Sequence, residues 1–435
     1  MATNQILRLT DAVNGASAFA LFSTPVNATG GLIIKFDFYS YGGTGGDGFS
    51  FFLLDGANTP TTAGGFGGSL GYAGRVDGTV PTPGIVGGYV GIGFDEFGNY
   101  SNDNEGRLGR APSTIQAQPD GTVPDSIAIR GSAAGGYAYL TGTGTLRPAD
   151  APTGLDNPGV TDLNLAKRTA QITLTPAGLF NVQIDFNADG DFSDPLETNP
   201  ELQNLNIAAL NGNVPIPSTF TFGFGAATGD STNIHEVGNF TVTTFDGTPI
   251  AGSLGSIRLV GRDLPGGDTI TGDRGGNTIV GGTGGDTQTG RGGADRFVFS
   301  GATKAEALRS SRLRNLDRIT DFRFRENDKF VLDFDNNLAT TSLPRRLFNA
   351  GAESPGLRRA ARSAYADKNQ VRPGNQALRP NEAVFFTMGS RTFLSVNDDN
   401  VGFNPRADLL AEVTGIQFKA GDNRRGKLQV TDYFA

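Results

Sequence analysis

A nine-residue period of glycine and aspartate runs from Asp263 to Val298 and limits the possible folds more than any other feature of the chain. Each repeat places a glycine-rich half-turn before a short alternating segment. Glycine allows the tight turns, and a short fixed period is the sequence signature of stacked β coils. The sequence therefore predicts a parallel β-roll over residues 263–300.

Acidic and apolar residues keep a constant register within this repeat. The acidic position is held by Asp268, Asn277, Asp286 and Asp295. The apolar position is held by Ile270, Ile279 and Phe297, and Gln288 departs from it. A flexible glycine linker is the alternative, but a linker would not need aspartate in register.

The nonapeptides resemble the repeats-in-toxin (RTX) family of calcium-binding β-rolls. The resemblance implies Ca²⁺ bound between turns by the four residues of the acidic position. It also implies type I secretion through an uncleaved C-terminal signal within residues 301–435, a β-rich module. Met1–Leu7 lacks the features of a secretory signal peptide, which agrees with export by a C-terminal signal. The resemblance therefore implies an extracellular or cell-surface location.

Composition excludes several functions. The 435 residues are enough for two or three domains, and 64 glycines with 31 phenylalanines suit many short strands and tight turns. With no cysteine, disulfides and zinc thiolate sites are excluded. The single histidine, His235, rules out a multi-histidine site and is expected to be a packed or surface residue, not a ligand. The net charge of -8 argues against nucleic acid, and no apolar run approaches the ~18 residues of a membrane span.

Residues 1–248 read as an all-β unit, followed by a linker or the first turn of the β-roll over 249–262. Strand-like alternation recurs in Leu32–Phe38, Ser126–Arg130 and Phe180–Phe186, with glycine, proline and aspartate between these runs. This pattern predicts an antiparallel β-sandwich.

Two motifs in this unit carry chemistry suited to sugars, Gly45–Leu53 and Gly91–Asn99. A carboxylate accepts hydrogen bonds from sugar hydroxyls, and an amide donates hydrogen bonds to them. An aromatic ring covers the apolar face of a sugar. Most of residues 1–248 resembles the L-type (legume-like) lectin family, particularly its bacterial branch. The resemblance implies a concanavalin-like jelly roll that binds carbohydrate.

Site residues follow from that resemblance. Asp47, after Gly46 and often across a cis peptide in the family, would accept sugar hydroxyls. Gly67 or Gly68 would supply a main-chain N–H, and the Phe97 ring and the Asn99 amide would contact the sugar. The last sugar-binding loop falls at residues 228–233, with Gly229 and Asp230.

The resemblance also implies a Ca²⁺ site beside the sugar. Asp95 would bind through its carboxylate, Phe97 through its carbonyl and Asn99 through its side-chain oxygen. Asp103 is the expected fourth ligand, with Asn102 as its rival. Gly93 stands where plant members place a manganese-binding glutamate, so a transition-metal site is not expected.

A second calcium loop is predicted from spacing alone. Oxygen-bearing side chains alternate, with glycine at the sixth position, in Asp185, Asn187, Asp189 and Asp191. Glu197 falls at position thirteen, one later than in an EF-hand. The alternative is a solvated acidic loop.

Together these patterns predict a secreted, calcium-dependent, non-catalytic carbohydrate-binding protein. A structural subunit of an extracellular layer is the main alternative. Residues 301–380 carry 16 Lys and Arg against 9 Asp and Glu, a local surplus of 7 that is compatible with contact between molecules. A solvated basic helix and loop near Leu357–Arg362 is the other explanation of this surplus. A glycoside hydrolase is a weaker alternative. Its usual Glu-x-Asp-x-x-Glu string is missing, and Asp95 and Glu96 would point to opposite faces of a strand.

Overall fold

The computed structural model divides the chain into two compact units, Met1–Ile257 and Arg258–Ala435. The structure describes residues 6–22, 24–60, 62–78, 80–146, 154–194, 197–250, 257–260, 267–272, 274–424 and 426–435.

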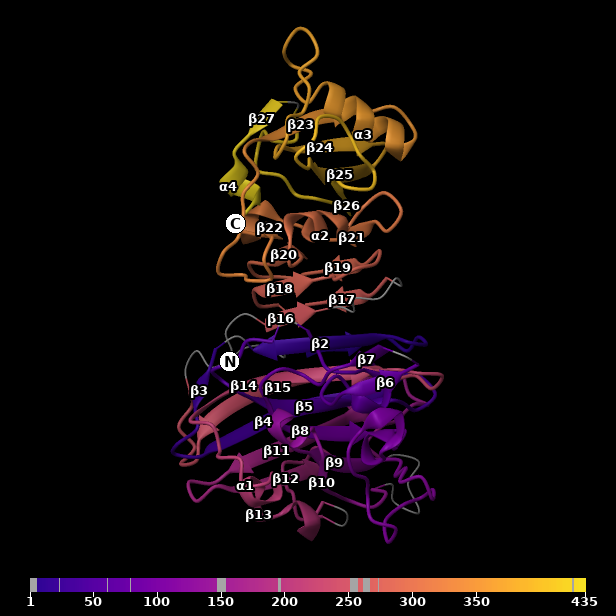
Figure 1. The fold of residues 1–435 in the computed structure, drawn as a ribbon, viewed down its shortest axis with the longest axis vertical. Coiled ribbons are helices and arrows are strands. Elements are labelled where there is room, and N and C mark those ends of the chain that lie inside the picture. Colours follow the sequence, from indigo (N-terminus) through magenta and orange to yellow (C-terminus); the bar gives the residue numbers. More distant parts are fainter. Residues whose placement is uncertain are drawn as a thin grey trace. The chain divides into compact units, whose positions relative to one another are not determined.

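The N-terminal unit contains two antiparallel sheets (Figure 1). The first has the order β13 (Leu205–Asn206), β12 (Leu179–Asp185), β11 (Lys167–Leu174), β4 (Leu32–Tyr41), β15 (Ile234–Thr244) and β1 (Ile6–Thr10). The second has the order β10 (Tyr139–Gly142), β9 (Ser126–Arg130), β8 (Gly88–Asp95), β5 (Gly48–Asp55), β14 (Thr219–Ala227) and β2 (Ser17–Phe22), with β3 (Val26–Asn27) also paired to β14. A separate hairpin joins β6 (Arg75–Asp77) to β7 (Val80–Thr82).

Phenylalanine rings fill the space between the two sheets. Alternate residues of a strand share a face, so Phe36 and Phe38 of β4 both meet the opposite sheet. The Phe36 ring centroid lies 5.2 Å from that of Phe51 on β5 and 5.0 Å from that of Phe224 on β14. This packing confirms the predicted all-β sandwich.

Strand register brings three loops to one end of the second sheet. Gly48 at the start of β5 pairs with Asp95 at the end of β8, and also with Ala227 at the end of β14. The chain before Gly48, after Asp95 and after Ala227 therefore meets at one edge. These are the segments in which the sequence predicts sugar and calcium ligands.

Short helices lie in the loops of this unit. They are η1 (Gly67–Ser69), η2 (Asn99–Ser101), η3 (Asn104–Gly106), η4 (Ala133–Gly135), η5 (Leu163–Ala166), η6 (Pro200–Leu202) and α1 (Ile207–Leu210).

Parallel strands open the C-terminal unit, as the nonapeptide period predicts. One stack runs β17 (Thr269–Thr271), β19 (Thr287–Thr289) and β21 (Asp317–Ile319), and the other runs β16 (Ile257–Val260), β18 (Asn277–Val280), β20 (Arg296–Ser300) and β22 (Lys329–Asp333). Thr269 pairs with Thr287, eighteen residues or two repeats later. One coil therefore consists of two nonapeptides.

Aspartate side chains link successive coils. The main-chain N–H of Asp268 donates to Asp286 Oδ1 at 2.8 Å, and that of Asn277 donates to Asp295 Oδ1 at 2.8 Å. The same bonds continue beyond the repeats, from Asp286 to Asp317 at 3.1 Å and from Asp295 to Asp328 at 2.9 Å. The parallel coils thus extend past residue 300.

A sheet with a covering helix completes this unit. Its strands are β23 (Leu347–Ala352), β24 (Ala383–Met388), β25 (Arg391–Val396), β26 (Leu409–Val413) and β27 (Gly426–Leu428). The helices are α2 (Lys304–Arg309), η7 (Phe324–Glu326), α3 (Leu357–Ala366) and α4 (Val430–Tyr433). Buried alanines of α3 pack on Phe348, Phe386 and Phe393. None of the helices in the described parts of the chain is long and apolar enough to cross a membrane.

Candidate functional site

Asp47 lies at the edge where the three loops meet, and the Gly46–Asp47 peptide bond is cis, as the lectin resemblance implies. The Asp47 N–H donates to the Ala227 carbonyl at 3.0 Å, and the Asp47 carbonyl accepts from the Phe97 N–H at 3.1 Å. A Cβ at Gly229 would lie 3.1 Å from Asp47 Oδ1. The structure therefore brings Gly229 to the carboxylate of Asp47 and Phe97 to its main-chain carbonyl.

The Asp47 side chain is almost wholly buried. Burial raises its pKa to about 6, with a smaller opposite influence of His235 and a further increase from the Glu96 charge. At neutral pH the group is therefore an ionised acceptor with little competing water, which suits hydroxyl recognition.

Phe97 is the apolar surface of the site. Phe97 is 46% exposed, whereas most phenylalanines in the described parts of the chain are buried. A Cβ at Gly46 would lie 3.6 Å from the Phe97 Cβ and 2.8 Å from the Ser231 Cβ. An exposed ring beside a carboxylate can cover the apolar face of a sugar while its hydroxyls bind Asp47.

Asp95 and Asn99 supply oxygen atoms suited to a hard cation. Asp95 is fully buried and accepts N–H bonds from Gly98 at 2.8 Å and Ser101 at 3.2 Å, and burial raises its pKa to about 8. Asn99 Oδ1 is buried and accepts no hydrogen bond from any described residue. A buried carboxylate close in sequence to an unbonded amide oxygen fits Ca²⁺, with the Phe97 carbonyl as a third ligand.

The two candidates for a fourth calcium ligand differ in exposure. Asp103 has 44% of its side chain exposed and lies 3.8 Å from Arg110. Asn102 is buried, but its Oδ1 already accepts from Arg107 at 2.6 Å and from the Asn104 N–H at 3.1 Å. The fourth ligand stays a prediction.

The glycine loop and the last sugar loop also reach this edge. A Cβ at Gly68 would lie 2.7 Å from the Asn99 Cγ, so Gly68 is the glycine that adjoins the Asn99 amide. Gly67 faces the Arg75 guanidinium instead. Asp230 is exposed and follows Gly229 directly.

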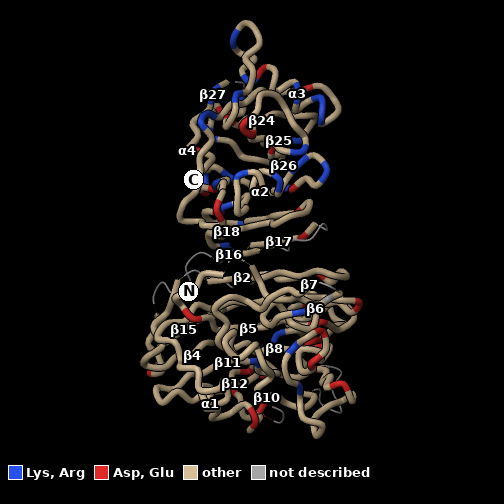
Figure 2. Tube along the Cα trace, in the orientation of Figure 1, with Lys and Arg blue, Asp and Glu red and all other residues tan. Residues whose placement is uncertain are grey.

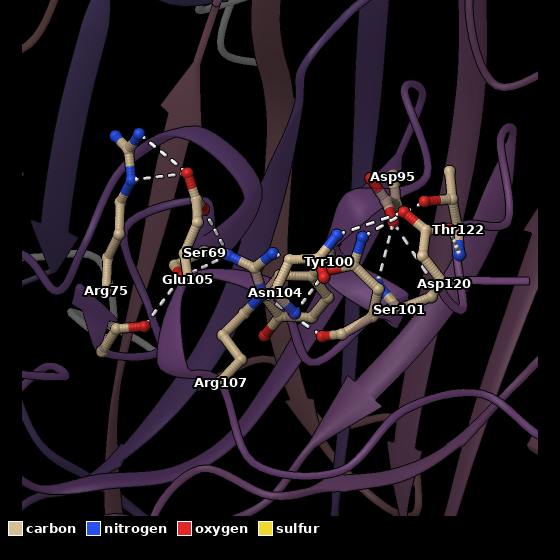
Figure 3. Close-up of polar contacts among 12 residues, drawn as sticks. Ser69, Arg75, Asp95, Tyr100, Ser101, Asn104, Glu105, Arg107, Asp120 and Thr122 are labelled. Carbon is tan, nitrogen blue, oxygen red and sulfur yellow. Dashed lines mark hydrogen bonds and ion pairs between the residues drawn. The ribbon is translucent and has the colours of Figure 1, made fainter. Parts of the chain in front are cut away.

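Two arginines that no sequence motif singled out, Arg107 (Figure 3) and Arg130, bond the candidate calcium loop. Arg107 bonds Ser69 of η1 at 3.2 Å and Glu105 of η3 at 2.7 Å. Arg130 is completely buried and donates to the carbonyls of Tyr100 at 2.9 Å and Asn102 at 2.6 Å. Buried carbonyls without donors are costly, so these guanidinium groups hold the loop in shape.

A buried polar network underlies the site. Glu96 Oε1 lies 3.0 Å from His235 Nε2, and the other His235 nitrogen lies 2.6 Å from Thr10 Oγ1. Burial pushes the pKa of Glu96 up, but attraction to His235 and the hydrogen bonds outweigh it, and the pKa is lowered. His235 is fully buried, as expected of a packed residue. Asn233 donates to Glu96 at 2.7 Å and to Asp156 at 2.9 Å.

An acidic cleft of about 560 Å³ borders Phe97. It is lined by Thr44, Gly45, Glu96, Phe97, Gln118, Asp120, Thr122, Pro124, Asp125, Asp156 and Pro158. No sequence motif predicts a role for its four carboxylates, which belong to Glu96, Asp120, Asp125 and Asp156. They come from three separate segments, so only the fold brings them together.

The second predicted calcium loop curls around its own side chains. Asp185 accepts the N–H groups of Asp189 at 3.3 Å and Gly190 at 2.9 Å, and Asp189 accepts that of Asp191 at 2.9 Å. Asn187 donates to Asp189 and Asp194. Glu197, one position late for an EF-hand, accepts the N–H groups of Phe186 at 2.7 Å and Asp194 at 3.2 Å, and thereby closes the loop.

The four predicted ligands of the parallel coils are all buried, namely Asp268, Asn277, Asp286 and Asp295. Asp317 and Asp328 occupy the equivalent position in the coils that follow the repeats. Their signal in the sequence is an aspartate two residues before an apolar side chain, as in the repeats. Across the described residues, no group of three or more acidic, histidine or cysteine side chains is arranged to hold a metal ion.

Comparisons with known proteins give structural similarity only. No protein-family model and no curated protein matches the chain. The Ca²⁺- and Man3GlcNAc-bound VIP36 exoplasmic/lumenal domain is similar at 14% identity and a TM-score of 0.34, covering 56% of this chain and 82% of that domain. Lectin UEA-II complexed with galactose is similar at 17% identity and 0.34 (55% and 87% covered), and peanut lectin at 17% and 0.32 (54% and 84%).

Proposed function

We propose that the N-terminal unit is a calcium-dependent carbohydrate-binding module without catalytic activity, in a protein that is secreted or displayed at the cell surface. The observation that carries the proposal is the meeting of Asp47, Phe97 and Asn99 at one edge of the second sheet. An ionised acceptor, an exposed ring and an amide are the groups that recognise a sugar.

Calcium would act through Asp95, Asn99 and the Phe97 carbonyl. When bound, the ion would offset the buried charge of Asp95 and fix the position of Asn99 Oδ1. The Asn99 NH₂ is then free to donate to a sugar hydroxyl, beside the acceptor of Asp47. Calcium removal should therefore abolish binding without unfolding the sandwich, whose phenylalanine core is separate from the loop.

The test is a glycan array with the full chain in millimolar Ca²⁺, repeated in chelator. Asp47→Asn removes the charge while keeping the shape, and is expected to lose at least about ten-fold in affinity, since hydrogen bonds to a charged group contribute about 1.5–3 kcal/mol. Asp55→Asn, an aspartate at the far end of the same strand β5, is the matched control.

Two outcomes would contradict the proposed sugar binding, and a third would contradict the proposed lack of catalysis. One is binding that persists in chelator or in Asp47→Asn. The other is no glycan binding by folded, calcium-loaded protein, which favours the structural-subunit alternative if the protein also assembles as Ca²⁺ is added. Release of reducing sugar from a bound glycan would contradict the non-catalytic part.

A further inference from the structure

A second cleft, of about 620 Å³, lies within the C-terminal unit. The segment between α3 and β24 forms most of it, with contributions from β23, β27 and the loop after β25. Its lining residues are Arg346, Phe348, Lys368, Asn369, Arg372, Asn375, Gln376, Ala377, Leu378, Arg379, Val401 and Lys427.

The charge of this cleft is entirely positive. Five of its lining residues are Lys or Arg and none is Asp or Glu, and Figure 2 shows Lys and Arg concentrated in this part of the chain. Glu382, which lies outside the lining, compensates two of them: it pairs with Lys368, and Arg346 lies 4.0 Å away.

The other three cations remain without a counter-charge. Arg372, Arg379 and Lys427 are exposed, and none of them forms an ion pair with another described residue. Like charges gathered in a concave site create a potential that attracts an anion. Arginine in particular binds carboxylate, sulfate and phosphate through two parallel hydrogen bonds.

The cleft also presents hydrogen-bond acceptors that lack donors. Asn369 is only 8% exposed, and its Oδ1 accepts no hydrogen bond from the described residues. Gln376 Oε1 is buried and likewise accepts none. These two oxygens need a ligand that donates hydrogen bonds. A simple anion such as phosphate has few donors, whereas the hydroxyl groups of a sugar donate readily.

Apolar surface completes the cleft. Phe348 and Leu378 are buried beneath it, and Val401 is 78% exposed at its side. No exposed aromatic ring is among the lining residues that the structure describes, so the stacking platform typical of single-stranded nucleic acid binding is missing.

We propose that this cleft binds an anionic polysaccharide, a chain whose sugars carry carboxylate, sulfate or phosphate groups. The anionic groups pair with Arg372, Arg379 and Lys427, and the ring hydroxyls donate to Asn369 and Gln376. The site is distinct from the candidate site of the N-terminal unit and does not depend on it. It would give the protein a second carbohydrate contact of different chemistry.

The test measures binding of polygalacturonate and dextran sulfate to the full chain in millimolar Ca²⁺, by calorimetry at two salt concentrations. The triple variant Arg372→Gln/Arg379→Gln/Lys427→Gln should weaken binding on the order of ten-fold, because each exposed ion pair contributes a fraction of a kcal/mol to about 1 kcal/mol. The matched control is Arg358→Gln/Arg359→Gln/Arg362→Gln on the exposed face of α3, which removes the same charge outside the cleft.

Three comparisons decide the outcome. Selective loss in the cleft variant supports the proposal, and equal loss in the α3 variant overturns it in favour of diffuse charge attraction. Stronger binding of polygalacturonate than of polyglutamate, which has carboxylates without hydroxyls, supports sugar recognition, and equal binding overturns it. Preferential binding of single-stranded DNA or of phosphate-headgroup vesicles would also overturn it.

A further variant tests the role of Asn369. Asn369→Leu should reduce the preference for polygalacturonate over polyglutamate at unchanged thermal stability.

The failure of this proposal and that of the N-terminal site can be told apart. The cleft variant should keep all chelator-sensitive binding of neutral glycans that the wild type shows. If that binding disappears with the cleft residues, the two sites are not independent and the inference fails.

Discussion

Buried carboxylates accept main-chain hydrogen bonds in both units, but from different partners. Asp95 in the sandwich accepts from residues three and six positions later, and Asp185 from residues four and five positions later. Asp295 in the parallel coils accepts from Asn277, eighteen residues earlier, and Asp328 accepts from Asp295 at a separation of 33.

The hydrogen bond between a carboxylate and a main-chain N–H therefore has two different uses in this protein. A carboxylate that bonds its own loop fixes the shape of that loop and can present it to a ligand. A carboxylate that bonds the neighbouring coil fixes the stacking of one coil on the next. Mutations in the first class should act locally, and mutations in the second should act on the cooperative stability of the coils.

The largest effect is expected for Arg130→Met, which removes the donor that holds the calcium loop. The buried Tyr100 carbonyl would lose its Arg130 donor, and that of Asn102 would keep only the Arg107 Nε–H at 3.3 Å, costing about 3–5 kcal/mol of unfolding free energy in the N-terminal unit. Urea unfolding followed by hydrogen exchange in each unit measures this. Arg110→Met is the control, because 47% of that side chain is exposed. Equal destabilisation by both variants would contradict a special role for Arg130.

The next largest effect is a pH dependence of the metal-free protein. Burial raises the pKa of Asp95 to about 8 and that of Asp47 to about 6, against 3.8 in the unfolded chain. The folded state therefore binds more protons than the unfolded state between pH 4 and 8, and stability falls as pH rises through this window. The slope is at most about 1.4 kcal/mol per pH unit for each carboxyl that stays protonated in the folded state and is ionised in the unfolded state.

Thermal unfolding from pH 4.5 to 8.5, in chelator and in Ca²⁺, measures this dependence. Calcium should flatten the profile if it neutralises the charge of Asp95, and Asp95→Asn should flatten it in chelator. An unchanged slope in Asp95→Asn would show that other groups cause the dependence.

A smaller effect should distinguish the two classes of carboxylate. Asp295→Ala leaves the Asn277 N–H of the neighbouring coil without its acceptor, and should destabilise the C-terminal unit by about 1–3 kcal/mol in chelator. Asp191→Ala in the exposed loop of the sandwich should change stability by less than about 0.5 kcal/mol under the same conditions. The exchange rate of the Asn277 amide reports the first change directly. The comparison fails if Asp191→Ala is as damaging as Asp295→Ala.

The smallest effect is a gain in stability. Gln288 occupies the apolar position of its repeat, is buried, and has neither amide atom hydrogen-bonded to a described residue. Gln288→Leu should therefore raise the free energy of unfolding by about 1 kcal/mol or more. Gln171→Leu on β11 is the control, because its amide donates to Gln183 at 3.3 Å. A loss of stability in Gln288→Leu would mean that the buried amide has a partner in solution.

The sequence by itself determined the strands, the coil period and the core of the candidate site. Alternation along β4, β9 and β12 sufficed to predict the sandwich, because side-chain direction in a strand depends only on residue parity. The order Asp95, Phe97, Asn99 was enough to predict the candidate ligands of one loop, since these residues follow one another at the end of β8. The nonapeptide period sufficed for the parallel stacking of β17 and β19.

Only the tertiary structure decided which distant residues share a site. Glu96 and His235 are 139 residues apart, and Arg130 and Tyr100 are 30 residues apart. Lys427 meets Arg372 at the basic cleft only because β27 pairs with β23. No local pattern encodes such pairs, because they depend on the order of strands in the sheets. The continuation of the coils to Asp317 and Asp328 was hidden for a related reason: the spacing grows from 18 to 31 and 33 residues while the hydrogen bond stays the same.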